Sequence, residues 1–121
     1  MLQSVFLGEK KRPIVFGNWV FRKMKAEKGI TPGQIVESFQ QGDTTVLPDV
    51  VFYGLQAGEL ATNVQNPDTY TADDVALWMD LAPAGIKIYV DMLVQAITGE
   101  APQNGEEGEK KKAAAIGTST E

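Results

Sequence analysis

The chain has 121 residues, 43% of them hydrophobic, and a formal net charge of −5 at pH 7, which fits one acidic domain with a small core. It contains no cysteine and no histidine, which excludes disulfides, thiol chemistry, Cys/His zinc sites and the usual neutral-pH general base. No apolar run approaches the ~20 residues of a membrane helix, and polar residues follow the first strand-like segment, so we expect neither a membrane span nor a signal peptide.

Charge is unevenly distributed along the chain. Residues 1–30 contain seven Lys or Arg and two acidic residues, whereas residues 31–99 contain one basic residue, Lys87, and nine acidic residues. This asymmetry predicts either head-to-tail self-contact that salt would weaken or a partner of opposite charge. The alternative is that the charged side chains only keep two faces of the domain hydrated.

Residues 1–16 predict a β-hairpin. Residues 2–7 alternate in part, residues 8–12 read as a polar turn, and residues 13–16 return as a second strand. The proline that opens this second strand favours an edge position. Because an isolated hairpin is marginal in water, we expect it to pack on the helices or to add to the sheet of another subunit.

The next segment predicts a basic helix. Asn18 is expected to cap a helix that begins at Trp19, and Gly29 is expected to end it. Lys25 and Lys28 fall in its last turns, where the helix dipole favours positive charge. Three apolar residues of this helix are expected to face inward: Trp19, Val20 and Met24.

Two further helices are expected between residues 31 and 61. Thr31 and Pro32 are a cap residue and a first helical residue, and the second of these helices spans about residues 45–61. Gly54 and Gly58 lie four residues apart in it, which would let another backbone approach closely, most simply at a helix crossing.

Residues 71–99 predict a pair of helices with well-marked ends. Thr71 is a cap residue whose hydroxyl can accept from the backbone N–H of Asp74. Pro83 is expected to end this short helix and to open a longer one, which runs to Thr98 and stops at Gly99. The apolar stripe of the longer helix has a 3.6-residue period and consists of Ile86, Tyr89, Val90, Leu93 and Ile97.

After Gly99 the composition changes, and only one large aliphatic residue, Ile116, remains. Such a segment cannot bury enough apolar surface to offset its own ordering entropy, so residues 100–121 are expected to be a disordered tail. The predicted fold is therefore mainly α. It has about five helices in residues 1–99, with an N-terminal β-hairpin in residues 1–16.

The sequence lacks the residues of a catalytic or cofactor site. No serine stands beside a base, no GxxxxGK[ST] or GxGxxG loop occurs, and the acidic residues do not match a calcium loop. Asp73 and Asp74 are interpreted as acidic residues in the first turn of a helix rather than as metal ligands. We therefore expect no enzyme activity, no cofactor and no metal.

Residues 72–93 also have the outline of a helix-turn-helix. The second helix would carry Ile86, Lys87 and Ile88 in the most acidic part of the chain, where phosphates would be repelled. The basic residues between Lys10 and Lys28 are a better candidate for nucleic acid but belong to no recognisable signature. Nucleic-acid binding is therefore the weaker interpretation.

Four short motifs occur in order along residues 14–99: FGNW at 16–19, GIT at 29–31, YGL at 53–55 and TxxDVxxWMD at 71–80. Their order and spacing, in a short acidic helical chain that starts with a hairpin, resembles the tail assembly chaperones of long-tailed bacteriophages. The resemblance implies a non-enzymatic protein of the bacterial host cytoplasm that is absent from the mature virion. It would bind the tape-measure protein, keep it soluble and help to recruit the tail-tube protein.

Members of this family are often made in two forms, the longer one by a ribosomal frameshift. Glu109 and the three lysines at 110–112 fit a slippery site near the end of the short, unshifted product, although an ordinary charged tail explains them equally well. A chaperone also needs an exposed apolar groove for amphipathic helices. The residues predicted to line that surface are Leu55, Trp78, Met79, Ile88 and Met92.

Two other functions remain open from the sequence. One is a structural virion component, such as a head–tail connector or a tail subunit. The other is a small helix-turn-helix-like regulator that binds nucleic acid.

Overall fold

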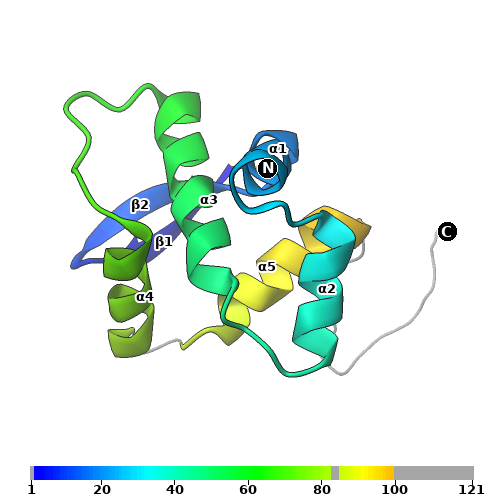
Figure 1. The fold of residues 1–121 in the computed structure, drawn as a ribbon. Helices are drawn as coiled ribbons and strands as arrows, with labels where there is room; N and C mark the ends of the chain where they lie inside the picture. The colour runs from blue at the N-terminus through cyan, green and yellow to red at the C-terminus, as the bar shows by residue number, and fades with distance from the viewer. Residues whose placement is uncertain (1, 83–84, 100–121) are drawn as a thin grey trace, which may run out of the picture.

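The structure, a computed structural model, describes residues 2–82 and 85–99. Within these residues the chain forms one β-hairpin followed by five α-helices (Figure 1), which confirms the mainly α class with an N-terminal hairpin. The predicted disordered tail lies outside the described residues. The elements are β1 (Leu2–Leu7), β2 (Lys10–Val15), α1 (Asn18–Lys28), α2 (Pro32–Gln40), α3 (Leu47–Thr62), α4 (Ala72–Leu81) and α5 (Lys87–Thr98).

The hairpin has a tighter turn than the sequence suggested. Gly8 and Glu9 alone form it, with φ of 61° and 67°, as a two-residue turn with a right-handed strand twist requires. The polar residues 10–12, expected in the turn, instead open β2, because their backbone pairs with β1. Pro13 consequently lies in the middle of the edge strand β2, opposite Ser4.

The capping residue of α1 was predicted wrongly. Gly17 occupies the N-cap position and no side chain caps the helix, while Asn18 is already helical. Gly29 ends α1 with φ of 70°, as expected. Val20 and Met24 are buried, but Trp19 is 38% exposed, and the ammonium of Lys23 lies over its ring.

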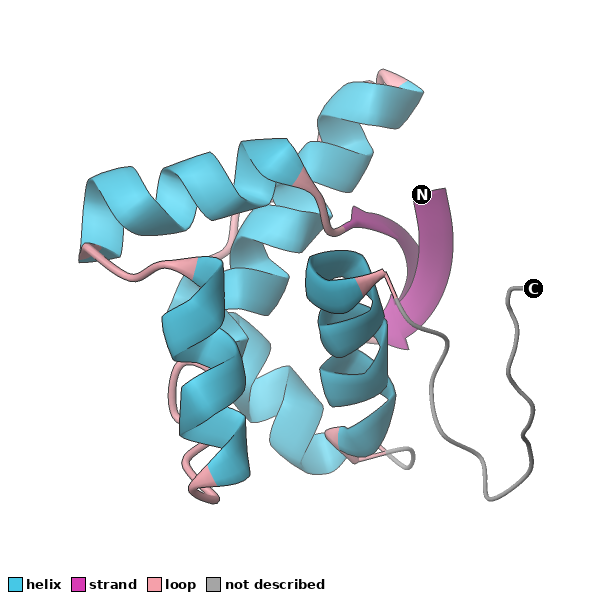
Figure 2. Ribbon diagram, turned by 90° about the vertical axis from the view of Figure 1, so that its right-hand side faces the viewer, coloured by secondary structure: helices cyan, strands magenta, loops and turns pink. Residues whose placement is uncertain are grey.

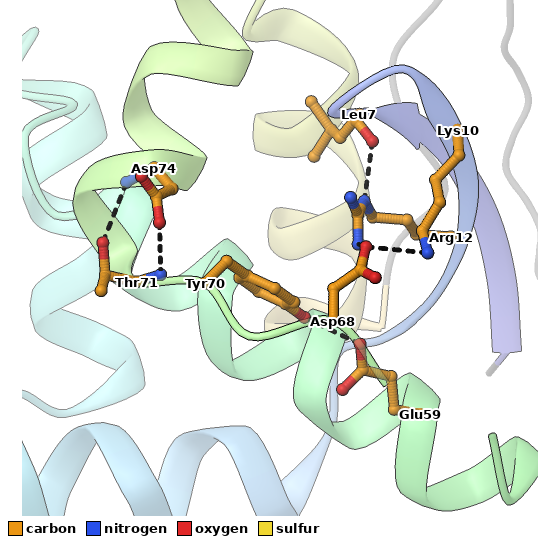
Figure 3. Close-up of polar contacts among 8 residues, drawn as sticks. All are labelled: Leu7, Lys10, Arg12, Glu59, Asp68, Tyr70, Thr71 and Asp74. Atoms are coloured by element: carbon orange, nitrogen blue, oxygen red, sulfur yellow. Dashed lines mark hydrogen bonds and ion pairs between the residues drawn. The ribbon is translucent and has the colours of Figure 1, made fainter. Parts of the chain in front are cut away.

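The other predicted caps are confirmed. Thr31 and Thr71 each accept from the backbone N–H three residues on, at 3.2 Å in both cases, and each forms a full capping box (Figure 3 shows Thr71 with Asp74). The predicted start of α5 needs correction: Gly85 has φ of 67° and the helix begins at Lys87, while Pro83 lies outside the described residues.

The two glycines of α3 bring a strand, not a helix, close to it. A Cβ atom on Gly58 would overlap the carbonyl of Pro13, and one on Gly54 would lie 2.7 Å from the ring of Phe16. The close approach of another backbone was predicted correctly. The expected helix crossing was wrong, because the neighbouring backbone belongs to the strand β2. The hairpin is thereby attached to the helical body along α3.

α3 is the central element of the domain. It packs against β2, α1, α4 and α5, with α1 and α4 on different sides of it (Figure 1), and the hairpin lies at the margin of the helical body (Figure 2). All seven elements contribute to one core. Its buried residues are Val5, Leu7, Ile14, Phe16, Val20, Met24, Ile35, Leu47, Val50, Val51, Leu55, Ala57, Val75, Met79, Tyr89 and Leu93.

Candidate interaction surface

Arg12 joins the hairpin to the loop that precedes α4 (Figure 3). Its side chain is 5% exposed; Nε donates to the carbonyl oxygen of Leu7 at 2.7 Å, and Nη1 lies 3.2 Å from a carboxylate oxygen of Asp68. The ammonium of Lys10 lies 2.8 Å from the same oxygen, and its hydrogen bond lowers the pKa of Asp68. Each charged group of this cluster therefore has a partner.

Two aromatic rings enclose the Arg12 guanidinium. Its central carbon lies 4.5 Å from the centre of the Trp78 ring and 5.3 Å from that of Tyr70, within the range of cation–π attraction. The hydroxyl of Tyr70 donates to Glu59 at 3.0 Å, which fixes its ring. These contacts hold Trp78 of α4 against the hairpin turn.

The fit at the turn depends on Gly8. A Cβ atom at this position would lie 2.8 Å from both the Trp78 ring and the Arg12 guanidinium. Gly8 is thus required twice, for its positive φ and for the space that it leaves.

An open apolar groove lies between the end of β1 and α4. Its volume is about 520 Å³. Three large side chains on it are exposed: Phe6 at 65%, Leu77 at 58% and Leu81 at 75%. The groove is lined by Phe6, Leu7, Gly8, Glu9, Leu77, Trp78, Leu81 and Ala82.

α4 is apolar on two opposite sides. Val75 and Met79 face the core, one turn apart, whereas Leu77 and Leu81, also one turn apart, face away from it. One stripe is enough to attach a short helix to its domain. The second stripe leaves exposed apolar surface, which in soluble proteins commonly marks an interaction site.

The residues predicted to contact a partner are dispersed in the structure. Trp78 lines the groove, as expected of a surface residue. Leu55 and Met79 are 0% and 2% exposed, so they are core residues and the prediction that they lie near the surface is wrong. Ile88 is 43% exposed but outside the groove, and half-buried Met92 lines a separate pocket of about 230 Å³ beside Phe16 and Gln3.

The three large apolar residues exposed in the groove, Phe6, Leu77 and Leu81, were not among the predicted partner-binding residues. Leu77 and Leu81 lie four positions apart, and this second apolar stripe is visible in the sequence beside the stripe of Val75 and Met79. Phe6 gave no comparable signal, because it stands in an apolar run whose inward side depends on the register of the hairpin.

The described residues hold no group of three or more His, Cys, Asp or Glu side chains placed to bind a metal ion. None of the helices in residues 2–82 and 85–99 is both long and apolar enough to cross a membrane. We found no protein-family model, curated protein or solved structure that matches this chain.

Proposed function

We propose that the protein is a tail assembly chaperone of a long-tailed bacteriophage, in its short form. It binds amphipathic helices of the tape-measure protein, keeps that protein soluble until assembly and helps to recruit tail-tube subunits. The observation that carries this proposal is the groove beside α4, where Phe6, Leu77 and Leu81 are exposed.

The groove suits a helix as ligand. Leu77 and Leu81 stand one helical turn apart and form a short ridge, with Trp78 as the wall and Phe6 on the opposite strand. An amphipathic helix presents apolar residues at the same spacing, so its stripe can pack beside this ridge. α4 also carries three acidic residues, Asp73, Asp74 and Asp80, whose charges keep the surface around the groove hydrated.

The TxxDVxxWMD motif, part of the resemblance to these chaperones, supports the same proposal. Its Thr71 and Asp74 cap α4, Val75 and Met79 attach the helix to the core, and Trp78 forms the wall of the groove. The motif therefore specifies a helix that is capped, attached to the core and placed with Trp78 in the groove.

Co-expression with the tape-measure protein of the same phage tests the proposal. We expect the wild-type chain to raise the soluble fraction of that protein and to co-purify with it. The double variant Leu77→Asp/Leu81→Asp should lose both effects, because it places charge in the groove. The matched control is Leu60→Asp on α3, whose side chain is 67% exposed but lies outside the groove.

Three results would contradict the proposal. The first is an unchanged solubility of the tape-measure protein in the presence of the wild-type chain. The second is the presence of the chain in purified mature particles, which indicates a structural virion component. The third is micromolar binding to duplex DNA at physiological salt, which indicates a nucleic-acid-binding regulator.

A further inference from the structure

β1 leaves one edge without a partner in the described part of the chain, where the sheet consists of β1 and β2 alone. Its sequence, LQSVFL, contains no charged residue, no proline and no glycine. Soluble proteins usually protect such an edge with a charge, a proline, a bulge or a covering segment. Leu2 and Phe6 on the outer face of this strand are also 50% and 65% exposed.

The register of the hairpin decides which backbone groups face that edge. In a two-residue hairpin the residues flanking the turn, Leu7 and Lys10, form a hydrogen-bonded pair, and such pairs alternate with non-hydrogen-bonded ones. Ser4 and Pro13 therefore form a non-hydrogen-bonded pair, which agrees with the missing N–H of proline. The N–H and C=O groups of Leu2, Ser4 and Phe6 accordingly point away from β2.

We propose that β1 pairs with β1 of a second copy of this chain, antiparallel and with Ser4 on the two-fold axis. In antiparallel pairing, residues that direct their backbone groups to the shared edge must stand opposite one another. With Ser4 opposite Ser4 of the second copy, Leu2 stands opposite Phe6 of that copy, and Phe6 stands opposite its Leu2. This register satisfies the edge-facing backbone groups of both strands and places two pairs of apolar side chains together.

Several features favour a second copy over another extended partner. β1 is complementary to itself, since it is uncharged and carries its exposed apolar residues symmetrically about Ser4. Antiparallel pairing also places the tip lysines, Lys10 and Lys11, at opposite ends of the joined sheet, whereas parallel pairing would bring them together. The result is a four-stranded sheet, which is more stable than an isolated two-stranded one.

Sedimentation of the full chain tests the pairing. We expect a dimer for the wild type and a monomer for Ser4→Lys at the same concentration, because the variant places two ammonium groups across the axis. The control Gln40→Lys adds the same charge at an exposed position of α2 and should remain dimeric. Circular dichroism of each variant confirms that the helices are retained.

Cross-linking provides the second readout, because the natural chain has no cysteine. Ser4→Cys should give a disulfide-linked dimer on mild oxidation, since opposed residues of an antiparallel pair stand within the Cα distance that a disulfide spans. Lys11→Cys lies on the same outer face but on β2, away from the axis, and should not cross-link.

A monomeric wild type would overturn the pairing. Equal cross-linking at both positions would overturn it too, as would an oligomer that survives Ser4→Lys and dissociates in salt, which would indicate head-to-tail charge contact instead. Ser4 does not line the α4 groove, whereas Phe6 lines it and also stands opposite Leu2 of the second copy. Sedimentation and cross-linking are therefore carried out on the chain alone, and a failure to bind the tape-measure protein does not decide the pairing.

Discussion

The guanidinium carbon of Arg12 lies 4.5 Å from the centre of the Trp78 ring, and this contact connects the N-terminal hairpin to α4. In the sequence, these two residues are separated by more than half of the described chain. The groove proposed to bind client helices has one wall on each of these two elements. Arg12 therefore helps to set the geometry of the groove, together with the core contacts of Val75 and Met79.

Replacing Arg12 by alanine should lower the free energy of unfolding by about 2–3 kcal/mol. The loss comes from buried packing, the cation–π contacts and the bond to Leu7. The ion pair with Asp68 adds little, because that carboxylate is 44% exposed. Urea unfolding measures the change, and Lys11→Ala, at the exposed neighbouring position, should stay within about 0.5 kcal/mol of wild type. Equal stability of the two variants would contradict the structural role of Arg12.

Gly58→Ala should destabilise the protein by about 3 kcal/mol, because its methyl group would overlap the backbone of Pro13 and separate β2 from α3. Gly33→Ala is the matched control. Its methyl group would meet nothing closer than the Thr31 hydroxyl at 4.0 Å, so helix propensity should raise stability by about 0.5 kcal/mol. Thermal unfolding of both variants tests the contrast, and a neutral Gly58→Ala would show that the strand does not press against α3.

Stability should fall as the pH rises through about 10, the ordinary pKa of tyrosine. Burial raises the pKa of all three tyrosines in the folded protein, with a further contribution from the Glu59 carboxylate at Tyr70. The folded state therefore keeps phenolic protons that the unfolded state loses, and this contribution to stability, complete below the ordinary pKa, disappears above it.

Phenolate absorbance of the folded chain should accordingly rise at higher pH than that of the chain in denaturant. Tyr70→Phe removes the phenol that contacts Glu59 and should make stability less dependent on pH in this range. Coincident titration of the folded and denatured chains would refute the burial of these hydroxyls.

The sequence by itself determined the local features of the fold. Thr31 and Thr71 cap their helices because the groups that they satisfy lie three residues away, and Gly29 ends α1 because it adopts a left-handed conformation at little cost. The hairpin and the five helices followed from such signals together with apolar periodicity. None of these features requires knowledge of a distant neighbour.

Only the tertiary structure decided which apolar side chains are covered. Leu55 is buried because β2 and α4 pack against α3, whereas Leu77 stays exposed because no described element covers the outer side of α4. The approach of Gly58 to Pro13 joins positions 45 residues apart, and no local pattern records it. Periodicity shows which side of a helix is apolar, but the packing of distant segments determines whether that side becomes core or remains available to a partner.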